Sequence, residues 1–276
     1  FPVTLDLSTL TVSVDAGVAE VRMNRPKQAN SLSREMWSEL RAAANALDAD
    51  PSARVIVLSG EGKHFCAGID TTMLGELLSM APGEGDCAGR ASEAMRRVIL
   101  DLQDVITSFE RCRKPVLAAI QGACIGAGLD LAVACDLRYA TADANFVLKE
   151  VDMGLAADVG VLQRLPRIVG EGVARELAYT CRPVSGTEAA ELRLVNRCFG
   201  SAEELAKGVG EIARELAAKS PLAMRGTKHA ITYARDHSIA DGLDQIASWN
   251  GATLISNDLT EALSAFMEKR PGNYAD

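Results

Sequence analysis

Apolar and polar residues alternate near the start of the chain, on both sides of a turn at residues 15–17. This period of two is typical of a β-hairpin. In residues 31–47 the apolar positions instead recur every three or four residues, which predicts an amphipathic helix. The apolar run within residues 54–60 predicts a buried strand. A strand, a helix and a strand in this order favour a parallel sheet with crossover connections.

The later part of the chain changes from this alternation to a helical pattern. A Gly-rich stretch at residues 82–90 predicts a flexible loop before a long helix over 91–111. Two apolar segments, 115–122 and 137–141, predict further strands. From about residue 171 we expect helices only, over residues 171–181, 187–195, 202–219, 221–234, 238–256 and 258–269. The pattern therefore predicts an α/β core followed by a helical C-terminal region.

The composition excludes several classes of protein. Hydrophobic residues make up 48% of the 276 positions, which excludes a disordered chain. The formal net charge of −8 and the lack of a basic run exclude sequence-independent nucleic-acid binding, which needs a cationic surface. The three histidines are far apart in the sequence, so no metal site is expected. Seven cysteines without a Cys-x-x-Cys pair are typical of reduced thiols inside a cell.

Neither a membrane span nor a targeting segment is expected. The most apolar stretch, residues 115–135, contains Gln121, Asp130 and three glycines, so a buried strand, loop and helix are favoured over a bilayer crossing. Residues 1–10 lack the cationic start and apolar core of a secretory signal. The last residues do not form a peroxisomal Ser-Lys-Leu address.

Two Gly-rich turns could bring backbone N–H groups close to a ligand. One is Ala67-Gly68-Ile69, which follows a predicted strand, and its alternative is an ordinary strand-to-helix turn. The other is Gly126-Ala127-Gly128 at the start of a predicted helix, where unpaired N–H groups suit a developing anion. Asp130 lies in the first turn of that helix. Its carboxylate either stabilises the helix dipole or has a role in the function of the protein.

A third segment carries three carboxylates within nine residues. A carboxyl group in an apolar pocket has a raised pKa and can then move protons near neutral pH. The alternative is a solvated loop with ordinary surface acids, but Asp158 lies between small and apolar residues. Glu150 and Asp158 are therefore interpreted as functional, whereas Asp152 is interpreted as structural or as part of the surface.

In their order and spacing, several short motifs resemble the crotonase (enoyl-CoA hydratase/isomerase) superfamily. The motifs are Asn24-Arg25-Pro26 with Ala29-Asn30, Phe65–Asp70, Lys114-Pro115 with Gly122–Gly128, Cys135–Arg138 and Leu165–Gly170. The chain is most similar to the Δ(3,5)-Δ(2,4)-dienoyl-CoA isomerases in the segment from Val147 to Gly160. One departure is Ala127, where the family usually has Gly; an alanine is tolerable there if its φ is negative.

The resemblance implies a spiral of ββα units over residues 1–200 and a helical trimerisation region over residues 201–276. It also implies an acyl-CoA thioester as substrate, no cofactor beyond the CoA of that substrate, and a homotrimer or dimer of trimers. By the resemblance, Asp130, Glu150 and Asp158 are the catalytic acids, and the N–H groups of Ile69 and Ala127 form the oxyanion hole. The backbone that binds CoA would include Gln28, Ala29, Ala67, Gly68, Ile69, Asp70, Thr71 and Ala127, and Lys228 is a candidate phosphate contact.

The implied reaction moves the double bonds of a 3,5-dienoyl-CoA to the 2,4 positions, in the β-oxidation of unsaturated fatty acids. Asp158 is expected to remove the proton at C2 and Glu150 to return one at C6, with the opposite order of the two acids left open. The alternatives are an enoyl-CoA hydratase or another acyl-CoA enzyme of the family, and a catalytically inactive member that binds a macromolecule or an acyl-CoA. The mitochondrial matrix is the favoured location, with the cytoplasm and the peroxisome left open.

Overall fold

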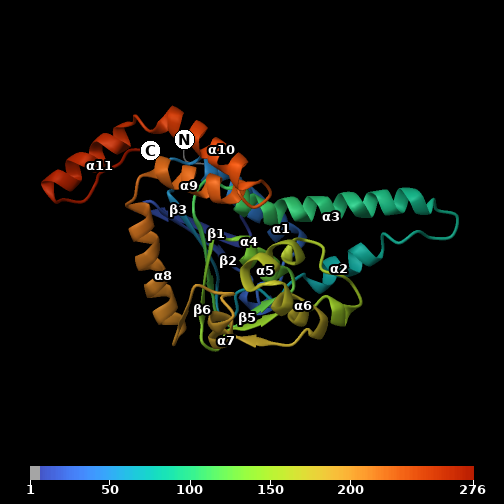
Figure 1. Cartoon of the computed structure of the whole chain (residues 1–276). Coiled ribbons are helices and arrows are strands. Elements are labelled where there is room, and N and C mark those ends of the chain that lie inside the picture. Colours follow the sequence, from blue (N-terminus) through green and yellow to red (C-terminus); the bar gives the residue numbers. More distant parts are fainter. Residues whose placement is uncertain (1–6) are drawn as a thin grey trace.

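Two β-sheets organise residues 7–276, the part of the chain that the computed structural model describes (Figure 1). Within the larger sheet, β1 and β2 are antiparallel and all other neighbours are parallel. Its strands, in spatial order, are β1 Leu10–Asp15, β2 Val18–Met23, β3 Val55–Gly60, β4 Val116–Ile120, β6 Leu137–Thr141 and β9 Arg197–Phe199. The smaller sheet contains β5 Ala123–Ile125, β7 Asn145–Val147 and β8 Val184–Ser185.

Pairs of consecutive strands divide between the two sheets. Strands β4 and β6 join the large sheet, while β5 and β7, which directly follow them, join the small one. At the corner between β4 and β5, Gly122 has a φ of +57°, and a Cβ there would overlap the carbonyl of Lys63. Each strand pair is followed by helix, so the expected ββα spiral and the α/β fold class are confirmed.

The helices lie on both faces of the large sheet. They are α1 Arg34–Ala49, α2 Thr71–Leu78, α3 Ala88–Arg111, α4 Ala127–Ala134, α5 Val161–Val169, α6 Glu171–Thr180, α7 Gly186–Glu191, α8 Ala202–Ala217, α9 Pro221–Tyr233, α10 Ile239–Thr253 and α11 Asn257–Glu268, with 3-10 turns at Pro26–Gln28 and Val151–Met153. Because side chains alternate along a strand, Val55 and Val57 of β3 pack under α8, whereas Ile56 and Leu58 join the core on the other face.

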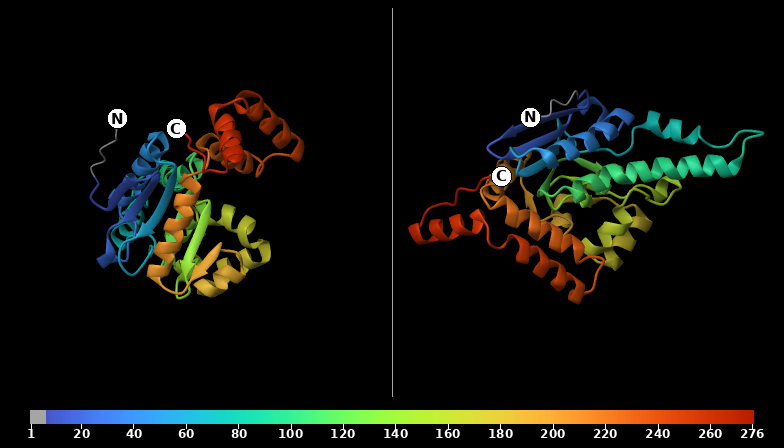
Figure 2. Two further views of the ribbon diagram at one scale, coloured as in Figure 1. Left: turned by 90° about the vertical axis from the view of Figure 1, so that its left-hand side faces the viewer. Right: turned by 90° about the horizontal axis from the view of Figure 1, so that it is seen from above.

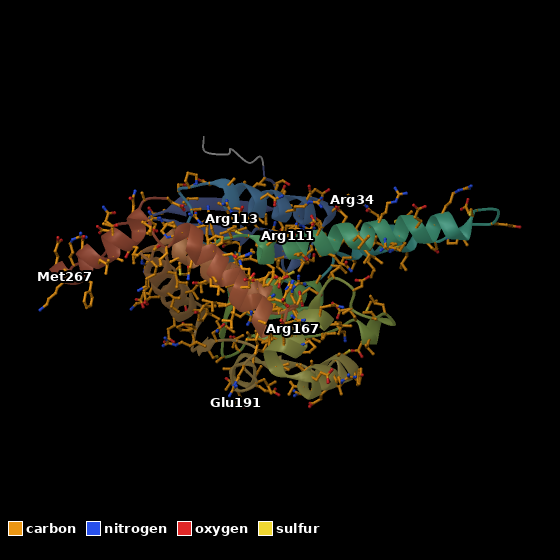
Figure 3. The ribbon with its side chains drawn as sticks, turned by 45° about the horizontal axis from the view of Figure 1, so that its top comes forward. Arg34, Arg111, Arg113, Arg167, Glu191 and Met267 are labelled. Atoms are coloured by element: carbon orange, nitrogen blue, oxygen red, sulfur yellow. The ribbon has the colours of Figure 1, made fainter. Side chains whose placement is uncertain are left out.

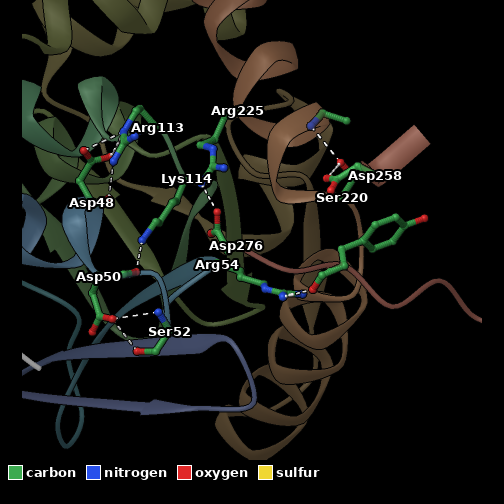
Figure 4. Close-up of polar contacts among 12 residues, drawn as sticks. Asp48, Asp50, Ser52, Arg54, Arg113, Lys114, Ser220, Arg225, Asp258 and Asp276 are labelled. Atoms are coloured by element: carbon green, nitrogen blue, oxygen red, sulfur yellow. Dashed lines mark hydrogen bonds and ion pairs between the residues drawn. The ribbon is translucent and has the colours of Figure 1, made fainter. Parts of the chain in front are cut away.

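The last helices leave the body of the molecule. Helix α9 stays attached through Lys228, which pairs with Asp136 at 2.7 Å and donates to the carbonyls of Phe109 and Lys114. The C-terminal tail also links α9 to the body, and Figure 4 shows two of its contacts, Asp276 with Arg225 of α9 at 2.6 Å and the carbonyl of Tyr274 with Arg54. Helices α10 and α11 extend away from the sheets (Figures 1 and 2). These two helices and the link between them expose large apolar side chains, among them Ile255 of the link at 99% and Phe266 of α11 at 80%. Figure 3 labels Met267, another exposed residue at the end of α11.

Most of the predicted elements are confirmed. The hairpin, the first helix, the strand at 54–60 and the strand at 137–141 are all present within a few residues of the expected bounds. The expectation of helices only after residue 171 is wrong, because β8 and β9 lie in that part of the chain. These strands have two and three residues, too few for alternation to reveal them.

Some expectations stay untested. The boundary between residues 200 and 201 stays a prediction; helix α8, which follows it, packs on the large sheet with the core. Residues 1–6, part of the segment inspected for a secretory signal and of the expected 1–200 core, lie outside the described residues. None of the helices in residues 7–276 combines the length and apolarity that a bilayer crossing requires.

Candidate active site

The two Gly-rich turns lie in direct backbone contact. Cys66 donates its N–H to the carbonyl of Ala123 at 2.9 Å and accepts one from Ile125 at 3.0 Å. A Cβ on Gly68 would lie 3.0 Å from the carbonyl oxygen of Ile125 and 3.8 Å from the nitrogen of Ala127. A Cβ on Gly128 would lie 2.6 Å from the carbonyl oxygen of Cys66. The glycines therefore allow an approach that side chains would prevent.

The N–H groups of Ile69 and Ala127, one in each turn, have no acceptor among residues 7–276. Ala127 is the first residue of α4, so its N–H has no partner within the helix. The φ of Ala127 is not positive, which meets the condition for an alanine at this position. Around Ile69, the carbonyl of Gly68 and the N–H of Asp70 pair with Leu32, while the N–H of Ile69 stays free. The two expected oxyanion donors thus lie on facing turns.

A buried asparagine fixes the loop that faces these turns. Asn30 is fully buried; its Oδ1 accepts the N–H of Arg25 at 2.9 Å, and its Nδ2 donates to the carbonyls of Glu61 and His64. In the same loop, Ala29 accepts the N–H of Ala67 at 3.0 Å. The structure therefore brings the CoA-binding candidates Gln28 and Ala29 next to residues 67–71. Asn30 is expected from the sequence only as part of a family motif, because its buried hydrogen bonds reach residues that are far away along the chain.

Asp70 also holds this region together. Its carboxylate caps α2 by accepting the N–H of Thr72 at 2.9 Å, and it pairs with Arg25 at 2.9 Å. The hydrogen bonds from the backbone N–H of Thr72 and from the side chain of Arg25 lower the pKa of Asp70. A carboxylate with these two partners is a structural group rather than a proton carrier.

Asp130 is fully buried one turn into α4. Its Oδ1 accepts the N–H of Val161 at 2.6 Å, and its Oδ2 is buried without a partner in the described chain. Burial raises the pKa of Asp130 to about 7, and repulsion from Glu150 adds to the shift. Asp130 therefore holds the segment that follows Asp158, and it is not a surface acid that merely stabilises a helix dipole.

Glu150 lies beside the second Gly-rich turn because β5 pairs with β7. Ile125 is in register with Val147, and Gly126 donates its N–H to the carbonyl of Val147 at 2.9 Å. The Oε1 of Glu150 is 3.3 Å from the point where a Cβ of Gly126 would lie. Its Oε2 is buried without a partner among the described residues. Burial raises the pKa of Glu150.

Asp158 is the most open of the three acids. Its neighbours Ala157 and Val159 are buried, but Asp158 itself is exposed in the single chain, so the expected apolar enclosure is incomplete. Its backbone carbonyl accepts a hydrogen bond from Gln103 of α3 at 2.6 Å. Partial burial still raises the pKa of Asp158, and its charge raises the pKa values of Glu150 and Asp130. The three acids therefore interact electrostatically.

Two other charged candidates serve the structure. Asp152 is exposed and pairs with Lys149 at 2.6 Å, which confirms its interpretation as a surface residue. The expectation that Lys228 contacts a phosphate is wrong, because its side chain is only 9% exposed and pairs with Asp136 at 2.7 Å. Residues 7–276 contain no group of three His, Cys, Asp or Glu side chains arranged to hold a metal ion.

Comparisons with known proteins identify the family of this chain. A family model described as enoyl-CoA hydratase/isomerase matches residues 13–276. An Arabidopsis thaliana protein named peroxisomal Delta(3,5)-Delta(2,4)-dienoyl-CoA isomerase is 49% identical over 98% of this chain and 96% of its own length. A Mus musculus protein, named as the mitochondrial form of that isomerase, is 41% identical over 95% of this chain and 80% of its own length. The crystal structure of an enoyl-CoA hydratase from Bacillus anthracis has a TM-score of 0.87 at 32% identity, with coverage of 97% of this chain and 99% of that one.

The raised pKa of Asp130 predicts a pH-dependent stability. A carboxyl group with a higher pKa in the folded state binds its proton more tightly there, so its contribution is full below about pH 4 and is lost as the pH rises to about 7. Replacing Asp130 with Asn removes this titration. Between pH 5 and pH 7.5 we expect the free energy of unfolding of the wild type to fall by about 2 kcal/mol more than that of Asp130→Asn.

Urea unfolding at fixed protein concentration measures the difference. The buried amide of Asp130→Asn changes the free energy of unfolding by the same amount at every pH. Only the dependence of this free energy on pH therefore reports the titration of Asp130. Parallel curves for the two proteins would show that Asp130 is not held neutral by its surroundings.

Proposed function

The chain belongs to the enoyl-CoA hydratase/isomerase family, and we propose that within this family it is a Δ(3,5)-Δ(2,4)-dienoyl-CoA isomerase of unsaturated fatty-acid breakdown. The observation that carries the proposal is the placement of Glu150 beside the turn that carries the free N–H of Ala127, with Asp130 and Asp158 close enough to interact with it. The names of the Arabidopsis and mouse relatives support the same activity.

The free N–H groups of Ile69 and Ala127 would bind the oxygen of the substrate thioester. Removing a proton from C2 turns that carbonyl into an enolate, and negative charge then develops on its oxygen. Donors that are already in place stabilise this charge without reorganisation, and a single such donor contributes about 3–4 kcal/mol. The backbone contact at Gly68 and Gly128 keeps the two donors in position.

The position of Glu150 favours it as the base at C2, opposite to the order expected from the sequence. C2 is bonded directly to the thioester carbon, so the base that reaches it has to lie next to the oxyanion donors. Glu150 meets this requirement through its contact with Gly126. C6 lies four bonds further along the acyl chain, and Asp158 is the second acid available for it.

In the proposed reaction Glu150 takes a proton from C2 and Asp158 gives one to C6. The electrons of the broken C–H bond form the new C2–C3 double bond, the other double bond moves to C4–C5, and no net oxidation occurs. Asp130 positions Asp158 by accepting the N–H of Val161. Proton transfer of this kind needs no group beyond the acyl-CoA, so no cofactor is proposed.

The CoA part of the substrate is assigned to the loop that Asn30 holds. We propose that the backbone of Gln28 and Ala29, together with residues 67–71, contacts it. Asp70 would contribute by fixing this backbone, since its carboxylate is already paired with Arg25. The phosphates are not assigned to Lys228.

A further proposal is that the exposed apolar side chains of α10 and α11 pack against other copies of the chain, as a trimer or a dimer of trimers. Phe266 of α11 and Ile255, in the link between the two helices, are 80% and 99% exposed, and exposed apolar surfaces of this kind mark contacts between proteins. We also keep the mitochondrial matrix as the proposed location; the relatives are named peroxisomal in one case and mitochondrial in the other.

Absorbance with 3,5-octadienoyl-CoA tests the activity. Isomerisation brings both double bonds into conjugation with the thioester carbonyl, so we expect a new band at longer wavelength. Crotonyl-CoA is the control substrate, and the wild type should hydrate it far more slowly. Rapid hydration of crotonyl-CoA without turnover of the dienoyl-CoA would identify a hydratase, and failure with both would favour an inactive binding protein.

The order of proton transfers is tested in D₂O with Glu150→Gln and Asp158→Asn. We expect both variants to lose turnover by about 100-fold or more, since each removes a general acid–base group. Asp158→Asn should still exchange the C2 hydrogens of recovered substrate for deuterium, and Glu150→Gln should not. Mass spectrometry of the substrate measures the exchange, and the opposite pattern would restore the order expected from the sequence.

Sedimentation equilibrium tests the self-association. We expect the wild type to have the mass of a trimer or hexamer and Phe266→Glu to dissociate, because a charge in an apolar interface is costly. Glu203→Gln, an exposed change on α8, is the control. A wild type with the mass of a single chain would contradict the proposal.

A further inference from the structure

A buried charge network lies behind the segment that carries Asp158. Arg164 of α5 donates through Nη2 to Oε2 of Glu110 at 2.8 Å and to Oγ1 of Thr107 at 3.2 Å, both on α3. The side chains of Arg164 and Glu110 are only 13% and 16% exposed. Glu110 also pairs with Arg235, which lies between α9 and α10. One carboxylate therefore joins α3, α5 and the C-terminal helical region.

The guanidinium of Arg164 rests against the backbone of Gly160. A Cβ on Gly160 would overlap Nη1 of Arg164, so this position has no room for a side chain. Gly160 also has a φ of +130°, which side chains rarely allow. Hydrogen bonds hold the chain before and after Gly160. The backbone carbonyl of Asp158 accepts one from Gln103, and the N–H of Val161 donates one to Asp130. Arg164 thus supports the middle of a segment whose two ends are tied.

The segment is packed into the core through Ala157, Val159 and Val161, but the side that faces this charge network borders a cavity. Val159 and Gly160 line a cavity of about 620 Å³, whose wall also includes Glu110, Arg164 and Arg235. On the side of a cavity a segment has fewer packing contacts than in a filled core. The ion pairs of Glu110 lie on this side, and a paired guanidinium holds its orientation better than a single charge would.

We propose that Arg164, held by Glu110, is a positioning residue that sets the place of the Asp158 carboxyl group for proton delivery to C6, and that Arg235 ties this support to the C-terminal helices. The proposal rests on the function proposed above. Arg164 touches the backbone behind Asp158 and does not touch the substrate. Replacing Arg164 should therefore slow the proton transfer to C6, which is assigned to Asp158. It should not slow proton removal from C2 by Glu150, because the pairing of β5 with β7 holds Glu150 in place.

The test compares net isomerisation with C2 exchange in Arg164→Met. Turnover of 3,5-octadienoyl-CoA should fall by roughly 10- to 100-fold, as for other displacements of a reacting group by about 1 Å. Deuterium exchange at C2 in recovered substrate should stay within about twofold of the wild type, because the misplaced residue acts only after that step. Arg164→Lys should recover part of the lost turnover, since it keeps the charge.

Arg167→Gln is the matched control. Arg167 is the next arginine of α5, is half exposed (labelled in Figure 3), and pairs with Asp236 rather than Glu110. We expect this variant to keep both turnover and C2 exchange. If Arg164→Met does not fold, Glu110→Gln provides the same comparison, because it removes the charge that holds Arg164 without changing the shape of the side chain.

The outcomes separate this proposal from the proposed function. Equal losses of turnover and C2 exchange, or no loss of either, would overturn the role of Arg164 while wild-type isomerisation stays intact. A wild type that does not isomerise the dienoyl-CoA would instead overturn the function itself. Loss of turnover alone in Arg164→Met and Glu110→Gln, with a normal Arg167→Gln, is the result we expect.

Discussion

The site depends on one steric constraint, the backbone contact between the turns around Gly68 and Gly128. No side chain fits between them, since a Cβ on Gly128 would lie 2.6 Å from the carbonyl of Cys66. The contact leaves the N–H groups of Ile69 and Ala127 without acceptors in the described chain. Unpaired N–H groups in a folded protein are costly unless a ligand or water satisfies them. A thioester oxygen that becomes negative during the reaction is such a ligand.

The acids of the site, like the two N–H groups, include polar atoms that have no hydrogen-bond partner in the described chain. Asp130 and Glu150 each keep one buried carboxyl oxygen without a partner among the residues that the structure describes, and burial raises the pKa of both. Most acids on this chain are instead paired with arginine or lysine, as Asp70 and Asp152 are. Acids with an unpaired buried oxygen can move protons, whereas acids in ion pairs hold the fold. Asp130 has features of both groups, because its pKa is raised and its Oδ1 accepts the N–H of Val161.

The sequence predicted the elements and the candidate residues better than it predicted their neighbours. The turn at 126–128 and the acids could be found from composition and from resemblance, because glycines and carboxylates in apolar surroundings are visible in one dimension. Glu150 lies beside Gly126 only because β5 and β7 pair, and three-residue strands have no readable period. The exposure of Asp158 and the role of Arg164 depend on how α3, α5 and the C-terminal helices meet, which spacing along the chain does not encode.

The most direct measurement is the carbonyl stretching frequency of hexanoyl-CoA, labelled with ¹³C at its thioester carbon and bound to the protein. Two fixed N–H donors polarise the carbonyl, so we expect the bound band at a lower frequency than that of the free thioester in water. Gly128→Ala, which separates the turns, should lose most of this shift. A bound thioester with an unshifted band in the wild type would show that the two turns do not hold the substrate oxygen.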